Sequence, residues 1–474
     1  MSARALSLGG FVAGKKTKRA KGKKRRSRSA AASTEYNLLL TATLCLLALG
    51  AVMVFSASST TQILSNGNLA ESAFYLKRTL IFGAFGLLVM HLSARHGLTA
   101  IRRLTPGLLV ASLFLLLVVL VAGSSANGAS RWIGPGSLQF QPSELAKVAL
   151  ILYGADLLAR EPKRVRSLQG LMPFLLVVGT ACLLVMAEPD MGTTMVIAFS
   201  IAATLVAAGA RPVDLGKIAL VLGGLALLLT VVEPYRMARL TGFLHPGADA
   251  AGAGFQAAQA KIALGSGGLF GVGIGNGVAK AGFLPEAHTD MISAVIGEEL
   301  GMVGILGVVG LFGLLGYAGL RVAQKAKDRY SKLLVSGLTS LILVQATINL
   351  FAVMGLAPLT GVPLPFISYG NSALLSCLFA VGLILNVARG GTASAAVGGG
   401  RSSSGKRTKK RKPARSSGAG KLRVVEGGRT AGARKRSQRS GSSRGGKSAQ
   451  SRSGSGGNRR PRRASDGRRR RASG

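Results

Sequence analysis

The middle of the chain alternates between long apolar runs and shorter polar segments. A helix needs about 20 apolar residues to cross the roughly 30 Å hydrocarbon core of a bilayer. About ten runs have this character, and we expect each of them to be a membrane-spanning helix. They are 37–57, 78–94, 106–123, 143–159, 170–187, 191–209, 213–232, 290–318, 332–355 and 366–387. The pattern therefore predicts an all-α polytopic membrane protein.

Clusters of basic residues recur in alternate connections between these runs. They fill the N-terminal tail, the connections after the second, fourth, sixth and eighth runs, and the C-terminal tail. Because short cytoplasmic loops are enriched in Lys and Arg, we expect all of these on the cytoplasmic side, together with both termini. The extracytoplasmic side then holds three longer segments, 58–77, 124–142 and 233–289, of which the last is a large loop between the seventh and eighth helices.

Composition divides the chain into three parts. A formal net charge of +43 and a mean hydropathy of +0.38 rarely coexist in one domain. Residues 1–36 and 389–474 are basic and poor in large apolar residues, so we expect disordered tails around a membrane domain at 37–388. Such tails would bind anionic lipid headgroups or an acidic protein. The apolar runs argue against a soluble nucleic-acid-binding protein.

Neither a disulfide framework nor a zinc motif is predicted. Cys45, Cys182 and Cys377 each lie inside an apolar run. The four histidines show no spacing typical of zinc ligands, so we expect no dedicated metal site.

The second outer segment carries Arg131 and Trp132 and leads into the fourth run through Glu144 and Lys147. Trp132 is a candidate substrate contact, and the alternative is a simple anchor, because tryptophan favours the membrane interface. Glu144 lies in the first turn of the expected helix, where the helix dipole favours an acid. Lys147, three residues later, either pairs with Glu144 or binds a substrate.

The third outer segment combines cations with carboxylates. It begins near Arg236 and Arg239, passes through a Gly-rich stretch, and closes with a group of four charged or titratable residues: Lys280, Glu286, His288 and Asp290. Arg and Lys are natural partners of a diphosphate. Cationic phosphate ligands beside a carboxylate at an outer membrane surface favour a lipid-diphosphate sugar over an ion or a soluble metabolite.

Four further acids have a structural interpretation. Glu188 and Asp190 flank a proline between two runs, and we expect them to cap and tie a helix reversal. Glu298 and Glu299 lie about 12–13 Å beyond Asp290 at 1.5 Å per helical residue, too far for chemistry at the same atom. We expect at least one of them in a buried ion pair that orients the helices.

Five stretches carry a family resemblance. They are "RWIGPGSLQFQPSELAK", "AEPDMGTT", "GFQAAQAKIALGSGGLFGVGIG", "LPEAHTDMISAVIGEELG" and "LPFISYGNSALL". In these motifs and their order, the chain resembles the SEDS family (shape, elongation, division and sporulation), and its division members in particular. It departs from the usual pattern at Met291, where an aromatic residue is common, and at Asn371, where glycine is frequent. The tails lie outside the resemblance.

The resemblance implies a peptidoglycan glycosyltransferase that polymerises lipid II in the bacterial cytoplasmic membrane at the division septum. Asp290 matches the family's essential acid. The implied partners are lipid II, glycan linked to undecaprenyl diphosphate, a class B penicillin-binding protein transpeptidase and other divisome proteins. A divalent cation, Mg or Mn, could assist, and no organic cofactor is expected.

The expected reaction is an inverting transfer of the lipid-linked strand to the 4-hydroxyl of lipid II. Asp290 would accept the proton of that hydroxyl or position the hydroxyl. Candidates for stabilising the diphosphate are Arg131, Lys147, Arg236, Arg239 and Lys280. Two alternatives are open at this point: a lipid II flippase and a non-enzymatic division scaffold.

Overall fold

The computed structural model describes residues 34–59, 69–126, 129–134, 139–244 and 254–392. The chain divides into two units, Met1–Gly400 and Arg401–Gly474, and the second lies outside the described residues. The predicted disorder of the tails concerns residues 1–33 and 393–474, which also lie outside the described residues. Residues 34–36, which the sequence placed in the N-terminal tail, already belong to the first helix, because Glu35 pairs with Lys325 and Tyr36 accepts a hydrogen bond from Arg389 at 2.6 Å.

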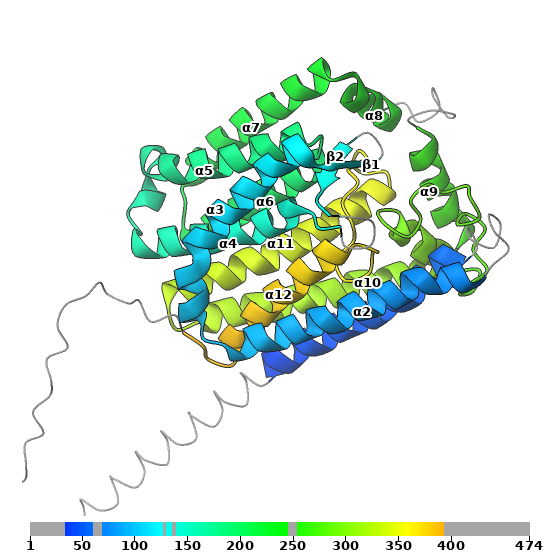
Figure 1. Cartoon of the computed structure of the whole chain (residues 1–474), viewed down its shortest axis with the longest axis horizontal. Coiled ribbons are helices and arrows are strands. Elements are labelled where there is room, and N and C mark those ends of the chain that lie inside the picture. Colours follow the sequence, from blue (N-terminus) through cyan, green and yellow to red (C-terminus); the bar gives the residue numbers. More distant parts are fainter. Residues whose placement is uncertain (1–33, 60–68, 127–128, 135–138, 245–253, 393–474) are drawn as a thin grey trace, which may run out of the picture. The chain divides into compact units, whose positions relative to one another are not determined.

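The described part is almost entirely helical (Figure 1). Its helices are the N-terminal helix Thr34–Ser59, α2 (Leu69–Arg95), α3 (Leu98–Ala122), α4 (Pro142–Arg160), α5 (Leu168–Ala187), α6 (Met191–Ala208), α7 (Pro212–Val232), α8 (Pro234–Leu244), α9 (Phe255–Ser266), α10 (Ile292–Lys325), α11 (Arg329–Val353) and α12 (Asn371–Ala388), with a 3-10 turn at Arg164–Arg166. Two short strands, β1 (Ser124–Ala126) and β2 (Ala129–Trp132), form an antiparallel hairpin.

Nine of the described helices are long and apolar enough to cross a membrane, and the protein is an all-α polytopic membrane protein. The remaining predicted span, 143–159, corresponds to α4, which has the expected bounds but is not among the nine because of its charged residues. Most of α4 is buried among α3, α6 and α11, so it can carry Glu144, Lys147 and Asp156 without exposing them to lipid. By contrast, α7 leaves most of its apolar side chains exposed.

The outer segment 233–289 is more ordered than a simple loop. Within the segment that the sequence predicted as a large loop, the structure has the helices α8 and α9. After α9, residues 268–273 insert into α10 itself. The carbonyls of Glu298 and Glu299 would normally accept hydrogen bonds from Met302 and Val303, four residues later.

In α10 these bonds are replaced by bonds to the inserted segment. The Glu298 and Glu299 carbonyls accept from the N–H groups of Val272 and Gly273, both at 3.0 Å. The Met302 and Val303 N–H groups donate to the Gly268 and Leu269 carbonyls at 3.0 and 3.2 Å. Gly301 breaks the helix at this point, with φ of 66° and ψ of −163°. The backbone groups released by the break are therefore satisfied inside the protein, which a membrane environment requires.

Glycines allow this close approach, which gives a test with a matched control. Gly271 has φ of +80°, and a Cβ there would lie 2.2 Å from the Glu299 carbonyl oxygen. Gly275 has φ of +90° and open space around it. Gly275→Ala should cost about 1–2 kcal/mol, because a Cβ disfavours positive φ. Gly271→Ala carries the same penalty and a backbone clash, so its melting temperature in detergent should fall several times further. Equal losses in the two variants would contradict the insertion.

Candidate active site

Asp290 lies immediately before α10 and is fixed from three sides. Its backbone carbonyl accepts a hydrogen bond from the Asn349 side chain of α11 at 2.7 Å. Asn349 also donates to the Val362 carbonyl at 2.8 Å and accepts from Ser293 at 2.6 Å. These hydrogen bonds join three elements at Asp290: the start of α10, the end of α11, and residues 354–370 between α11 and α12 (the 354–370 connection).

The Asp290 carboxylate lies close to one acid and one cation. Thr289 donates a hydrogen bond to Asp290 Oδ1 at 3.3 Å and to the Glu286 carboxylate at 2.9 Å. Burial, followed by the nearby negative charge of Glu286, raises the pKa of Asp290 to about 6, while the positive charge of Arg239 acts in the opposite direction. A carboxylate with a pKa close to neutral is suited to accepting a proton from a substrate hydroxyl.

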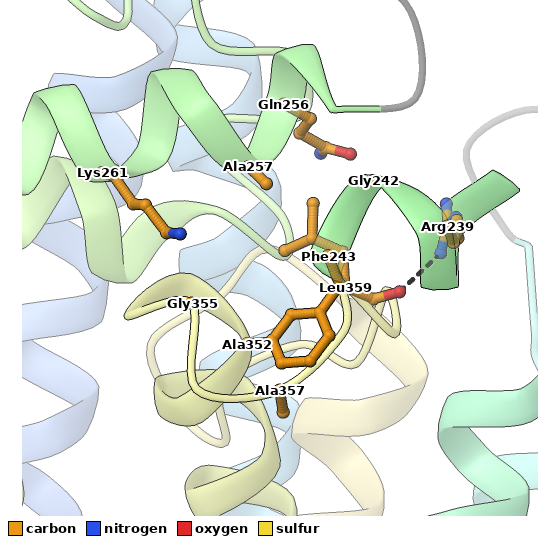
Figure 2. Close-up of a pocket in the computed structure, with 10 residues that line it drawn as sticks. All are labelled: Arg239, Gly242, Phe243, Gln256, Ala257, Lys261, Ala352, Gly355, Ala357 and Leu359. Carbon is orange, nitrogen blue, oxygen red and sulfur yellow. Dashed lines mark hydrogen bonds between the residues drawn. The ribbon is translucent and has the colours of Figure 1, made fainter. Parts of the chain in front are cut away.

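Arg239 contacts the same 354–370 connection. It donates a hydrogen bond to the Leu359 carbonyl at 3.0 Å (Figure 2). Two residues later, a Cβ on Gly361 would lie 3.9 Å from Asp290 Oδ2, so the predicted proximity of Arg239 to Asp290 has a geometric basis. Arg236 lies one turn earlier on α8, and its side chain is outside the described part of the structure.

His288 belongs to an aromatic cluster beside Asp290. Its ring lies 4.8 Å from that of Tyr75 and 5.6 Å from that of Tyr369, and its backbone carbonyl accepts from the Tyr369 N–H at 3.0 Å. Burial lowers the pKa of His288, which favours the neutral imidazole. The predicted His288 is therefore placed near Asp290 as an uncharged group.

Sequence reasoning missed Arg78, which joins the same cluster from α2. Its guanidinium lies 5.6 Å from the Tyr369 ring and donates to the side-chain oxygen of Asn371 at 2.9 and 3.0 Å. Asn371 is one of the two residues that depart from the usual family pattern, and this contact gives it a partner. The only sequence signal for Arg78 is its place at the start of the predicted run 78–94.

Arg131 and Trp132 end the β-hairpin, and Arg131 contacts the reversal between α5 and α6. Arg131 donates to the Glu188 carbonyl at 3.1 Å and to the Pro189 carbonyl, at the reversal between α5 and α6. Asp190 accepts from the Thr193 N–H at 2.9 Å and caps α6, as expected. The hairpin is thus attached to the reversal and not to Asp290.

Glu188 behaves differently from the prediction for its side chain. Its backbone ends α5, but its buried carboxylate oxygens have no hydrogen-bond partner among the described residues. Burial, with the charge of Asp190, raises the pKa of Glu188 to about 8, and Arg131 opposes this shift. The carboxylate that ties the reversal is therefore that of Asp190.

Two predicted substrate-binding lysines are instead paired inside the bundle. Lys147 contacts Glu144 at 2.7 Å and Gln345 at 3.0 Å, with both charged side chains at most 2% exposed. Lys280 contacts Glu299 at 2.6 Å, with both side chains 0% exposed, and Ser56 of the N-terminal helix at 2.9 Å. Neither lysine lies beside Asp290 or reaches the surface. Ammonium groups enclosed in this way are not available to a diphosphate in this structure. For Lys147 this is the first of the two alternatives that the sequence left open, whereas for Lys280 it departs from the expectation.

The remaining glutamate of the pair, Glu298, accepts hydrogen bonds from the backbone. Its carboxylate receives the Val278 N–H at 2.7 Å and the Ala279 N–H at 3.1 Å. Together with the Lys280–Glu299 pair, it fastens the loop that precedes Asp290 to α10. Both glutamates are thus engaged in holding the site's framework, and Glu299 forms the buried ion pair expected for at least one of them.

The family model of FtsW/RodA/SpoVE cell cycle proteins matches residues 36–392. The chain belongs to this family. A probable peptidoglycan glycosyltransferase FtsW of Trichlorobacter lovleyi is 40% identical over 75% of this chain and 94% of its own length. Stage V sporulation protein E of Bacillus subtilis is also 40% identical, over 74% of this chain and 96% of its own.

Solved structures of the FtsW/RodA/SpoVE family share the fold. One, described as "Structural coordination of polymerization and crosslinking by a peptidoglycan synthase complex", has a TM-score of 0.62 at 29% identity and covers 74% of this chain and 97% of its own. Thermus thermophilus rod shape determining protein RodA has a TM-score of 0.55 at 29% identity, covering 74% and 96%. The family therefore accounts for the membrane domain and leaves the basic tails unmatched.

Proposed function

We propose that the chain is a peptidoglycan glycosyltransferase that polymerises lipid II into glycan strands at the division septum. The observation that carries this proposal is the Asp290 carboxylate. Its pKa is raised to about 6, and it lies next to Gly361 of the 354–370 connection, which Arg239 contacts at Leu359. The chain belongs to the FtsW/RodA/SpoVE family. A near-neutral base beside a fixed cation suits a reaction that removes a hydroxyl proton and releases an anion.

In the proposed reaction, the 4-hydroxyl of lipid II attacks the anomeric carbon of the strand that is linked to undecaprenyl diphosphate. The new C–O bond forms as the bond to the diphosphate oxygen breaks, with inversion at that carbon. Asp290 takes the hydroxyl proton, and the diphosphate leaves with the bonding electron pair. Arg239 stabilises the charge that develops on the leaving group. His288, uncharged beside Asp290, adds no competing charge.

A divalent cation fits the residues around Asp290 only as a shared site. Among the described residues, no group of three or more His, Cys, Asp or Glu could hold a metal ion. Glu286 and Asp290, which contact the same Thr289 hydroxyl, supply two carboxylates. Magnesium is commonly held by one or two carboxylates together with substrate phosphates. These two residues would hold it, and its chemistry would be to neutralise diphosphate charge.

The remaining predicted ligands divide by what they contact. We assign Arg131 to positioning, since its guanidinium bonds the carbonyls of the α5–α6 reversal. We assign Lys147 and Lys280 to helix pairing through Glu144 and Glu299. Trp132, next to Arg131 at the end of β2, is proposed as a substrate contact or interface anchor on the outer side.

The proposed orientation places Asp290 outside the cytoplasm and both termini inside, following the one-sided distribution of Lys and Arg. The basic tails then face anionic lipid or an acidic partner protein on the cytoplasmic side, and a class B penicillin-binding protein cross-links the product outside. A reporter that is active only in the cytoplasm should give signal when fused at Gly474 and none when inserted after Gly252. Signal at both positions would exclude this topology.

Polymerisation, lipid flipping and scaffolding give different results in vitro. Purified protein with labelled lipid II in detergent should form a ladder of glycan products, because detergent offers no second leaflet for a flippase. Absence of the ladder, combined with lipid II transport in sealed vesicles, would favour the flippase. Absence of both activities would favour the scaffold.

A further inference from the structure

A pocket that is partly lined by the 354–370 connection combines two cations with apolar walls. Its lining comes from α8, α9, the end of α11 and the connection itself: Arg239, Gly242, Phe243, Gln256, Ala257, Lys261, Ala352, Gly355, Ala357 and Leu359 (Figure 2). The lining includes a lysine and an arginine but no carboxylate. Apolar walls lower the local dielectric constant, which strengthens the attraction of such a pocket for an anion.

Lys261 projects into this pocket and was not singled out by sequence reasoning. Its ammonium lies against the turn at Gly355, whose φ is +70°, and a Cβ on Gly355 would lie 2.1 Å from Lys261 Cε and 2.7 Å from Nζ. The absence of a side chain at Gly355 thus leaves room for Lys261. Unlike Lys147 and Lys280, Lys261 is exposed, and no carboxylate within ion-pair distance of it is found in the described part of the chain.

The surroundings of the pocket match a lipid-linked anion. The 354–370 connection leads from Leu359 to Gly361, next to the Asp290 carboxylate. Exposed apolar residues follow two of the lining residues directly in sequence: Leu244 follows Phe243, and Ile262 follows Lys261, at 59% and 61% exposure. A ligand seated here would have its sugar near the reacting carboxylate and its chain along an apolar surface.

We infer that this pocket binds the diphosphate of the lipid-linked substrate, with Lys261 and Arg239 as its two cationic contacts. The inference rests on the proposed function and extends it by assigning a binding role to Lys261. Lysine acts as a point charge toward phosphate, and Arg239 offers a planar fork of N–H donors. The 354–370 connection lines the pocket at Leu359 and passes the Asp290 carboxylate two residues later, at Gly361, so one segment links the leaving diphosphate to the group that receives the proton.

Lys261→Met tests this role, with Lys261→Arg to restore the charge and Lys332→Met as the matched control. Lys332 is exposed near the start of α11, about 30 Å along the helix from the pocket residue Ala352 at 1.5 Å per residue. In phospholipid-free detergent, Lys261→Met should raise the KM for lipid II about tenfold with a smaller change in kcat, as expected for a lost ground-state contact. Lys261→Arg should recover most of the affinity, and Lys332→Met should match the parent protein.

A binding measurement separates the pocket from the reaction. Undecaprenyl diphosphate should raise the melting temperature of the parent protein and of Lys332→Met, but raise that of Lys261→Met much less at the same concentration. If the parent protein binds this lipid but makes no glycan, the proposed function fails while the pocket assignment stands.

Two outcomes would overturn the inference. In the first, KM and the undecaprenyl diphosphate shift in Lys261→Met both equal those of Lys332→Met. In the second, KM in detergent is unchanged but Lys261→Met loses a stimulation of activity that added phosphatidylglycerol gives the parent protein. The second result would assign the pocket to the headgroup phosphate of a membrane lipid and not to the substrate.

Discussion

Asp290→Asn is expected to reduce glycan synthesis by about 100- to 10,000-fold, the usual range for a lost general base. The substitution keeps the side-chain volume but removes the charge and the ability to accept a proton. Folding should be retained, because the hydrogen bond that fixes this position to α11 is accepted by the Asp290 backbone carbonyl and not by its carboxylate. Glycan product and melting temperature should be measured on the same preparation.

A matched control is Glu161→Gln, which removes an exposed carboxylate that pairs only with Arg164 at 2.5 Å on the surface. This variant should retain full activity.

For the parent protein, kcat/KM should fall on the acid side with a midpoint near pH 6, since the base must be deprotonated and its pKa is raised to about 6. A well-folded Asp290→Asn protein with near-normal synthesis would remove Asp290 from the mechanism.

Lys280→Met is expected to produce the largest loss of stability. It leaves the Glu299 carboxylate, which is 0% exposed, with the Ser56 hydroxyl in place of a cation. Removing one partner of a buried pair typically costs about 3–5 kcal/mol, which corresponds to a fall in melting temperature on the order of 10 °C. Thermal unfolding in detergent measures this directly.

The double variant Lys280→Met/Glu299→Leu separates pairing from a direct role of the lysine in substrate binding. Replacing both charges by apolar groups of similar volume is often nearly neutral for stability. The double variant should therefore melt at a higher temperature than Lys280→Met and recover glycan synthesis per folded molecule. If its stability recovered while synthesis stayed low, Lys280 would be a substrate contact after all.

Helix positions could be predicted from the sequence because hydrocarbon imposes a length and an apolar composition on any lipid-facing span. The predicted run 191–209 corresponds to α6, Met191–Ala208, and 213–232 corresponds to α7, Pro212–Val232. Even α4 was placed correctly despite its charges, since the apolar residues from Val148 to Leu152 dominate it. The break at Gly301 was not predictable, because α10 contains several glycines and only the inserted segment 268–273 selects one of them.

The place of Asp290 was predictable, because it lies at the boundary between a cationic outer segment and an apolar run. Its catalytic role stays a prediction. The lysines were not predictable, because their partners are distant in sequence: Lys280 meets Ser56 and Lys147 meets Gln345. A charge at a membrane boundary indicates a ligand or an ion pair equally well until the helices are packed.

Lys261 illustrates the opposite error. It is the single lysine of α9, whose other residues are apolar, small or glutamine, and the sequence analysis did not single it out. The signal that could have found it is this isolation in a segment that also carries Gln256. Only the turn at Gly355, more than 90 residues later, shows why the ammonium lies over a pocket.

The most direct measurement of the central claim is glycan synthesis from labelled lipid II in detergent. It would compare the parent protein with Asp290→Asn, each alone and each mixed with a cognate class B penicillin-binding protein. Using Asp290→Asn in the same mixtures excludes a contaminating polymerase, because both preparations would carry it. The account predicts a glycan ladder that requires the parent protein and disappears with Asp290→Asn. Ladders of equal intensity from both proteins, or none from the parent protein in either mixture, would contradict it.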